Sequence, residues 1–440
     1  MKQFEIHRDG WLEDGLDDGD EARTFARVRI SVGTTILTRN LSGRGGGTSE
    51  AVNVPLLPFA QSLADSWWPL LYEPFRSGAG SAFKARHRLD VPMHGYIFPK
   101  VALCSGGSET LLTAWAQSPE EHARIEFLAP ASTNPDVLVL ARDQVEEQLM
   151  DVVEAVLERL NAKSASYNKL AAAWDRVQAS ISDHDELAYC RAAGRLGLDP
   201  YDPSSPDLTE FTADISNTVF EDISDAVFVE ELLETTAWVR DASVAWRQAP
   251  QIEVGAFGDF PGDLFDRPPW EVGNLAAETL RNNTGFDGDS PRKYLEQLFG
   301  RVLLVKSASF EKAPASIAAL IARDNSTAKL ATVARTAREQ RFKACSAAYI
   351  AWKAGSGEDR ASTPAFTRHQ QASRAFAAEL LSPRKYLQSR APKHGFTSDQ
   401  IEALAGELIC PFETVARQAY HAKIPLRGVE LPVLQQPAIA

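Results

Sequence analysis

Four residues between positions 87 and 122 are of types that bind zinc: His87, Asp90, His94 and His122. A zinc site needs three or four such ligands in a fixed geometry, and two ligands on one helix are commonly four residues apart. No pair in this group has that spacing on a predicted helix, and the first three fall on a passage from loop to strand. We therefore expect no metal site here.

Two further stretches match chemical motifs only in part. In SDHDELAYC, His184 precedes Asp185 and Glu186, but Ala188 stands where a second histidine ligand would be needed. Ser182 followed by acidic residues is more typical of a helix start, where such side chains cap free N–H groups. The stretch LSGRGGGTSEA lacks the GK[ST] ending of a phosphate-binding loop, so we predict a hairpin or surface loop.

The residue pattern at 341–383 predicts two helices joined by a polar connection that contains Gly, Ser and Pro. The apolar residues of the first recur every three or four positions and so share one face: Phe342, Cys345, Tyr349 and Trp352. The second helix begins near Arg368, and its apolar stripe is Ala372, Phe376, Ala377, Leu380 and Leu381. It ends at Ser382, because Pro383 cannot continue the helical hydrogen bonds.

These two helices resemble the active-site helices of the ImmA/IrrE-like zinc metallopeptidases. That family has an RF pair leading into an HExxH helix, and a later helix with the pattern ExxANxFAAxLLxP. Arg341-Phe342 matches the first feature, and FAAELLSP at 376–383 matches the second. The predicted order of helix, helix, strand and hairpin before Arg341 is also similar, so the resemblance covers roughly residues 265–425.

Carried over by position, the resemblance implies a zinc site in which other residue types replace the ligands and the general base. The two histidine ligands fall on Ser346 and Ile350, the general-base glutamate on Ala347, and the third ligand on Gln370. None of these has an imidazole or a carboxylate, so we expect no catalysis, no metal and no other cofactor. His369 is interpreted as an exposed polar histidine. Ser346, Ile350, His369 and Gln370 form the floor of a predicted partner-binding groove, unless Ile350 closes that groove by packing.

The composition limits the classes of partner and the cell compartment that the sequence predicts. A net charge of −13 opposes general affinity for nucleic acids and anionic membranes, because both surfaces repel it. No apolar run is long enough to span a membrane, and the acidic N-terminus does not resemble a signal peptide. The four cysteines are scattered without a CxxC pair, which indicates reduced core thiols in a cytoplasmic protein.

The pattern along 440 residues predicts a helix-dominated α+β fold in three parts. Residues 1–135 form an N-terminal α+β domain, with strands predicted at 25–37, 94–103 and 123–128 and with Trp67 and Trp68 in a core or interface. Residues 140–247 form a helical segment. A linker dense in Gly and Pro covers 248–269. The metallopeptidase-like domain covers 265–425, with helices at 270–284 and 293–299, a strand at 301–305 and a strand pair at 317–333.

Two short helices at 399–408 and 412–422 have the spacing of a helix-turn-helix. The second offers few polar or basic residues for DNA contact: Arg417, Gln418, His421 and Lys423. Neutralising phosphates needs more Lys and Arg than this, so we expect these helices to pack structurally.

The sequence therefore predicts a non-catalytic pseudo-peptidase that binds a protein or peptide partner. Members of the resembled family act in bacterial stress, toxin–antitoxin and phage-defence regulation, which implies a similar setting for this chain. Two alternatives remain open: a zinc peptidase whose ligands come from other segments, and a DNA-binding regulator that uses the C-terminal helix pair.

Overall fold

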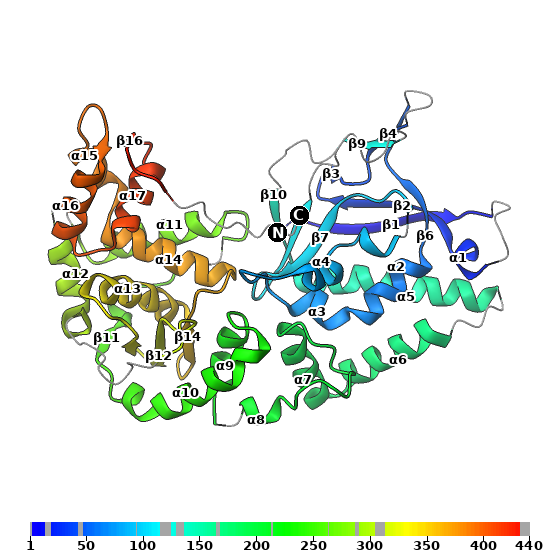
Figure 1. Cartoon of the computed structure of the whole chain (residues 1–440), viewed down its shortest axis with the longest axis horizontal. Helices are drawn as coiled ribbons and strands as arrows, with labels where there is room; N and C mark the ends of the chain where they lie inside the picture. The colour runs from blue at the N-terminus through cyan, green and yellow to red at the C-terminus, as the bar shows by residue number, and fades with distance from the viewer. Residues whose placement is uncertain are drawn as a thin grey trace. The chain divides into compact units, whose positions relative to one another are not determined.

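The structure is a computed structural model that describes residues 2–13, 19–42, 47–93, 95–114, 125–128, 136–163, 168–212, 214–262, 264–286, 290–303 and 313–431. The fold is helix-dominated α+β, as predicted (Figure 1). Contacts divide the chain into two compact units, one ending at Leu208 and the other beginning at Thr209. In the described ranges, no helix combines the length and apolar character needed to cross a bilayer.

The described residues of the first unit form three small sheets. In one, the central strand β2 pairs antiparallel with all three others: β1 (Phe4–Trp11), β2 (Phe25–Val32), β3 (Thr35–Ile36) and β6 (Val52–Pro55). The second has the order β10 (Asp136–Leu140), β8 (Thr110–Ala114), β7 (Val101–Ser105). The third has the order β5 (Thr48–Ser49), β4 (Asn40–Ser42), β9 (Ile125–Phe127).

Helices cover these sheets and complete the core of the first unit: α1 (Asp20–Arg23), α2 (Leu57–Asp65), α3 (Trp67–Tyr72), α4 (Ser81–His87), the 3-10 turn η1 (Val91–Met93), α5 (Arg142–Ala162), α6 (Asn168–Ser182) and α7 (His184–Arg195). The apolar stripe of α5 is buried from Val145 to Leu160, with Leu157 partly buried. Trp67 and Trp68 are each 2% exposed and belong to the core, as predicted. The helices α5, α6 and α7 therefore build the same unit as the N-terminal strands.

The second unit has one antiparallel sheet of order β11-β13-β12-β14, a two-stranded parallel sheet of β15 and β16, and helices around both. Its elements are α8 (Thr209–Thr212), α9 (Asn217–Ser224), α10 (Val229–Arg247), β11 (Gln251–Glu253), η2 (Val254–Phe257), α11 (Pro269–Asn283), α12 (Pro291–Phe299), η3 (Gly300–Leu303), β12 (Ala319–Asp324), β13 (Thr327–Thr332), α13 (Ala337–Lys353), β14 (Asp359–Ser362), α14 (Arg368–Leu381), α15 (Arg384–Arg390), β15 (Phe396–Thr397), α16 (Ser398–Leu408), α17 (Phe412–His421) and β16 (Leu426–Arg427).

The linker predicted at 248–269 is wrong over its first half. Strand β11 pairs with β13, with Ile252 opposite Ala328, and it therefore belongs to the main sheet. Val254 and Phe257 follow it into the core and are 1% and 0% exposed. Gly and Pro mark turns in a sequence, but the burial of three apolar side chains between them decided the structure.

Other local predictions are confirmed or corrected by the backbone. The helices at 270–284 and 293–299 and the strand pair at 317–333 are present as α11, α12, β12 and β13. The strand predicted at 25–37 divides at Gly33, whose φ of +56° makes the turn between β2 and β3. The strand predicted at 94–103 begins only at Val101. Residues 301–303 are a 3-10 turn and not a strand, and 304–305 lie outside the described residues.

Candidate functional site

The two helices that carry the resemblance, α13 and α14, are present and pack in one core. Thr336 caps α13 by accepting a hydrogen bond from the Glu339 backbone N–H at 3.2 Å. Of the predicted apolar face of α13, Cys345, Tyr349 and Trp352 are buried and Phe342 is partly buried; the Tyr349 ring lies 5.4 Å from that of Phe376 on α14. A Cβ added to Gly273 of α11 would lie 2.2 Å from the Ala372 carbonyl oxygen of α14. Glycine at 273 therefore permits this close approach.

The positions that the resemblance assigns to histidine ligands are filled by packed residues. Ser346 and Ile350 are each 3% exposed, and Ala347 is fully buried. The Oγ atoms of Ser346 and Ser373 are 2.8 Å apart, and the Oγ of Ser362 on β14 lies 3.4 Å from that of Ser346. Ser373 donates to a backbone carbonyl of its own helix, so Ser346 is the donor to Ser373. This position is a neutral, hydrogen-bonded part of the core.

Gln370, at the position of the third ligand, is 1% exposed and binds the backbone of β14. Its Nε2 donates to the Ala361 carbonyl at 2.8 Å, and its Oε1 accepts from the Thr363 N–H at 3.0 Å. Both ends of the side-chain amide are thus satisfied by one strand. Three of the four residues of the predicted groove are therefore buried, and in this conformation their side chains are not available to a partner.

His369, the fourth residue of the predicted groove, is not an exposed histidine as expected. Its side chain is 17% exposed, and its Nε2 lies 3.0 Å from Oδ1 of Asp222. Asp222 lies on α9 with its side chain 1% exposed, and Arg360 donates to both of its oxygens at 2.8 Å. The Ala361 N–H donates to the same carboxylate at 2.9 Å.

The charges in this cluster shift the pKa values of its members. Burial alone would raise the pKa of the Asp222 carboxyl, but Arg360 and His369 outweigh it and hold that pKa well below its usual range. Burial would lower the pKa of Arg360, and Asp222 raises it instead. The sequence VFEDISD contains one indication of this cluster. Asp222 lies three residues after Val219, on the apolar face of α9, and an acidic side chain on a buried face needs a partner.

The outer edge of β14, which is the last strand of the main sheet, is closed by side chains. Thr218 of α9 donates to the Asp359 carbonyl at 2.5 Å, and Asp222 accepts from Ala361. Gln370 binds the next two backbone groups, and Arg374 donates to the Thr363 carbonyl at 3.1 Å. An edge strand normally offers such groups to another strand. Here two helices satisfy them.

Arg374 has an unusual environment within this edge. Its guanidinium donates to the carbonyls of Thr363 and Ala365, which are neutral acceptors. Burial lowers the pKa of Arg374 to about 10. Arg374 therefore fixes the connection between β14 and α14 by hydrogen bonds to its backbone.

The zinc-type residues of the first unit form ion pairs in place of a metal site, as far as the structure describes them. His87 is fully buried, with Nε2 3.0 Å from Oε2 of Glu73 and Nδ1 2.6 Å from the Leu103 carbonyl. Burial raises the pKa of Glu73, but His87 and then Arg86 outweigh it, and the net shift is downward. Asp90 pairs with Arg88, and His94 and His122 lie outside the described residues.

The two partial motifs have structural roles. The cap of α7 is Asp183, one residue after Ser182, and it accepts from the N–H groups of Asp185 and Glu186 at 3.0 Å each. His184 is exposed at the first turn. Strands β4 and β5 pair antiparallel on either side of the glycine-rich stretch, whose residues 43–46 lie outside the description. No three His, Cys, Asp or Glu residues in the described ranges are grouped so that they could hold a metal.

All four cysteines are buried and free of disulfide bonds, which agrees with their interpretation as core thiols. Burial raises the pKa of Cys190 to about 11, and it raises those of Cys104, Cys345 and Cys410 to about 12. These thiols are therefore protonated at neutral pH.

The helix pair α16 and α17 packs into the core of the second unit. The α16 residues Ile401, Leu404 and Leu408 are buried, and α17 buries Val415 and Ala419. Gln418, which was considered for DNA contact, is 4% exposed and donates to Oε2 of Glu379 at 3.0 Å. The face of α17 that remains exposed carries Glu413, Tyr420 and His421.

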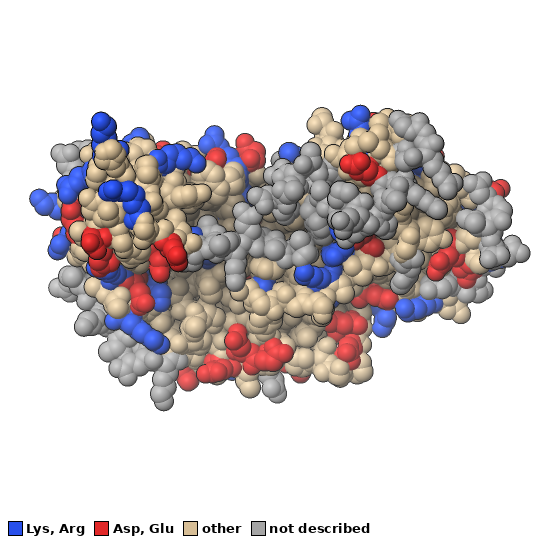
Figure 2. Space-filling model, turned by 45° about the horizontal axis from the view of Figure 1, so that its top comes forward, with Lys and Arg blue, Asp and Glu red and all other residues tan. Residues whose placement is uncertain are grey.

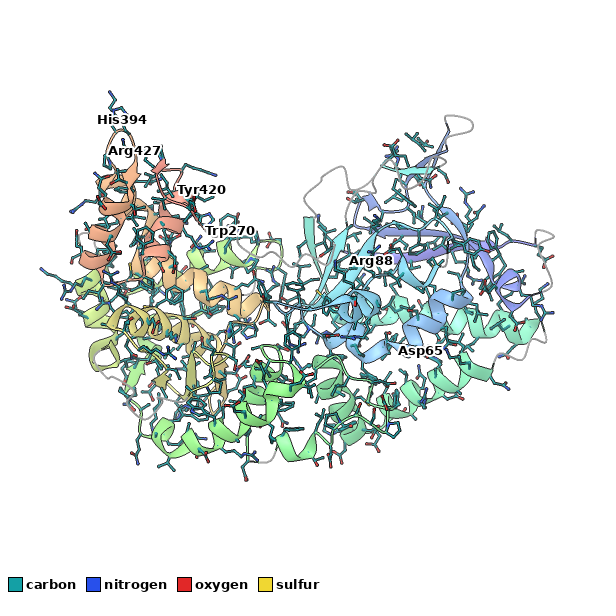
Figure 3. The ribbon with its side chains drawn as sticks, viewed as in Figure 1. Asp65, Arg88, Trp270, His394, Tyr420 and Arg427 are labelled. Atoms are coloured by element: carbon teal, nitrogen blue, oxygen red, sulfur yellow. The ribbon has the colours of Figure 1, made fainter. Side chains whose placement is uncertain are left out.

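A surface pocket of about 860 Å³ lies in the first unit between α1, α2 and the loop around Tyr96. Asp65, labelled in Figure 3, is one of its acidic residues. It accepts from Gln61 at 2.8 Å and pairs with Lys169 at 3.3 Å. None of the residues predicted from the motifs lines this pocket.

Comparison of the chain with protein-family models, curated proteins and solved structures finds no match.

Proposed function

We propose that the chain is a non-catalytic, metallopeptidase-like protein that binds a protein or peptide partner in a regulatory setting. One observation supports this proposal most directly. Ser346 and Gln370 are 24 positions apart in the sequence, but both side chains reach the same short segment around β14. Ser346 contacts Ser362, and Gln370 binds Ala361 and the residue just after the strand, Thr363. Zinc ligands from two helices would have to converge in the same way.

The chemistry at this point argues against catalysis. A catalytic zinc requires three ligands and a bound water, and a general base must take a proton from that water. Ser346 and Ile350 offer no such ligand, and Ala347 cannot accept a proton. The polar groups present are satisfied by one another or by β14, so they stabilise the fold and leave no donor or acceptor for a substrate.

Partner binding at this place requires a change at β14. The backbone groups that an added peptide strand would use are bound to Thr218, Asp222, Gln370 and Arg374. Displacement of α9 would free the Asp359 carbonyl and the Ala361 N–H for a partner strand. A partner of this edge should therefore bind Thr218→Val more tightly than the unmodified chain, because one competing hydrogen bond is removed. Equal affinity would place the partner on another surface.

A reconstruction of the ligand set tests the proposal. We expect the purified chain to contain well under one zinc per molecule, and a chelator should leave its melting temperature unchanged. The variant Ser346→His, Ile350→His, Gln370→Glu should bind Co²⁺ with the visible absorption of a four-coordinate ion, because the resemblance assigns a ligand to each of these positions and two of them, 346 and 370, reach the same segment. The matched control is Ser346→Ala, Ile350→Val, Gln370→Met, which changes the same positions without adding ligands.

Two results would overturn the proposal. Stoichiometric zinc in the unmodified chain, together with peptidase activity lost in His369→Ala, would favour a peptidase with rebuilt ligands. A reconstructed variant that is folded by circular dichroism but binds neither Co²⁺ nor Zn²⁺ would refute the positional match. Refolding in the presence of Zn²⁺ covers the case in which the variant is unfolded without metal.

A further inference from the structure

The end of the second unit formed by α11, α15 and α17 exposes two large aromatic side chains. Trp270 on the first turn of α11 is 47% exposed, and Tyr420 on the last turn of α17 is 59% exposed. The two lie at the same end of the unit in Figure 3. His421 links them: its ring is within 10° of parallel to that of Trp270 at 6.3 Å, and 5.7 Å from that of Tyr420. We call these three residues the aromatic surface.

Three cations lie near His421 of the aromatic surface in a chain that is acidic as a whole, and one acidic residue, Glu413, shares the exposed face of α17. Burial and then the nearby charges of Arg384, Arg417 and Lys423 lower the pKa of His421, which favours the neutral ring. Figure 2 shows several Lys and Arg side chains over the helices at this end. Arg384 is partly neutralised by Glu379 at 3.1 Å. Lys423 and Arg427 are exposed, and Figure 3 shows Arg427 at the same end of the unit as Tyr420.

We propose that single-stranded DNA binds the aromatic surface, with bases on Trp270 and Tyr420 and neighbouring phosphates on Arg417, Lys423 and Arg427. Exposed aromatic rings bordered by cations are the arrangement that holds unpaired bases and the backbone between them. No contact in this arrangement requires a 2′-hydroxyl, so DNA is sufficient. The proposal goes beyond the partner-binding function, since it uses none of the residues near β14.

Duplex DNA fits this end less well. A recognition helix in the major groove needs a face of polar side chains that reach the base edges. On α17 the residues Thr414, Val415 and Gln418 are buried, so few side chains of this helix could reach the base edges. Stacking on Trp270 and Tyr420 requires bases that are not already stacked within a helix.

A peptide of Asp and Glu would use the same cations, but it has no aromatic ring to stack on Trp270 and Tyr420. It would therefore gain nothing from Trp270 and Tyr420 beyond general apolar contact, whereas each base stacked on an aromatic ring contributes strongly to affinity. The response of binding to loss of each ring separates the two ligands.

Fluorescence anisotropy of a 5′-labelled dT20 oligonucleotide with the full chain tests the proposal. A label on the DNA is preferable to intrinsic fluorescence, because the chain has nine tryptophans. We expect the single strand to bind at least tenfold more tightly than a 20-base-pair duplex, and Trp270→Ala and Tyr420→Ala each to weaken it about tenfold. Trp270→Phe should retain much of the affinity. With three phosphates neutralised, log K should fall with log salt at a slope of about −2, and Lys423→Glu should reduce that slope.

Matched controls keep the result specific. Lys293→Glu reverses another exposed lysine of the same unit, and Val244→Ala removes an apolar side chain that is 68% exposed on α10. Both should leave the affinity unchanged. Circular dichroism and melting temperature identify any variant that has lost its fold. Both rings are exposed, so we expect their removal to leave the fold intact.

Four outcomes would overturn the proposal. They are unchanged affinity in folded Trp270→Ala and Tyr420→Ala, duplex binding as tight as single-strand binding, competition by polyglutamate at the same charge concentration, and an oligo-U RNA bound more than tenfold more tightly than dT20. The third would favour an acidic peptide, and the fourth would replace DNA by RNA. The zinc content of the chain is independent of all four, so this proposal and the proposed function can fail separately.

Discussion

Replacement of Asp222 by alanine should destabilise the second unit, because one carboxylate joins α9 to β14 and α14. In the variant, the Arg360 guanidinium would lose its bidentate partner and the Ala361 N–H its acceptor. Loss of one partner of a fully buried ion pair costs about 3–5 kcal/mol. The Arg360 side chain is 22% exposed and also pairs with Glu358 at 3.1 Å, so water and Glu358 recover part of this. We expect a loss of about 2–4 kcal/mol.

The assay is urea unfolding and thermal unfolding of the full chain. For a unit of this size, each kcal/mol corresponds to a shift of about 2–4 °C, so a 3 kcal/mol loss lowers the transition of the second unit by about 6–12 °C. The transition of the first unit should not move. Glu230→Ala, which removes an exposed acidic side chain from α10, is the matched control and should change stability by less than about 0.5 kcal/mol.

The double variant Asp222→Ala, Arg360→Met provides a sharper test. Removal of both charges eliminates the unpaired guanidinium, so the double variant should be more stable than Asp222→Ala alone. If it is less stable by the full sum of the two single changes, the ion pair is not what stabilises this contact.

The contribution of Asp222 to stability should depend on pH with a defined sign. The pKa of Asp222 is lower in the folded chain than its unfolded value near 3.8, so its contribution is fully present above that value. It is lost as pH falls from about 4 through the folded pKa. The stability difference between the unmodified chain and Asp222→Asn should therefore decrease below pH 4. A difference that stays constant down to pH 2.5, or a loss below 1 kcal/mol at pH 7, would refute the reasoning.

Three further changes test the packing of the same unit. Glu379→Ala removes a buried carboxylate bound by Arg281, Arg384 and Gln418. It should lower the free energy of unfolding in urea by about 3–5 kcal/mol. A loss below about 1 kcal/mol would show that the packing of α11, α15 and α17 does not depend on this carboxylate. Gly273→Ala should cost about 2–4 kcal/mol, because its Cβ would overlap a carbonyl oxygen of α14; a neutral effect would mean that the helices separate freely. Ile350→Glu places a charge in the core and should leave the second unit unfolded by near-ultraviolet circular dichroism, and a folded variant would support an open groove.

The division of the chain depends on packing that the local pattern does not contain. The range 140–247 was predicted as one helical segment, but its described helices are divided: α5 to α7 build the first unit, and α9 and α10 build the second. Periodicity reports which face of a helix is apolar, and it carries no information about which core receives that face. The glycines and prolines after Gln248 concealed β11 for the same reason, since Ile252 is stabilised by a strand more than seventy residues later.

The sequence by itself determined the helices of the second unit and the absence of ligand types from 346, 347, 350 and 370. Helix periodicity, capping and the stop at Pro383 are local properties, and an absent imidazole or carboxylate can be read from the residue type alone. Only the tertiary structure decided what replaced that chemistry. Ser346 finds Ser373, Gln370 binds β14, and His369 pairs with an aspartate 147 positions earlier in the chain. A buried polar group needs a hydrogen-bond partner, and that partner is whichever group lies near it in the folded chain. The sequence does not show which distant residues become neighbours.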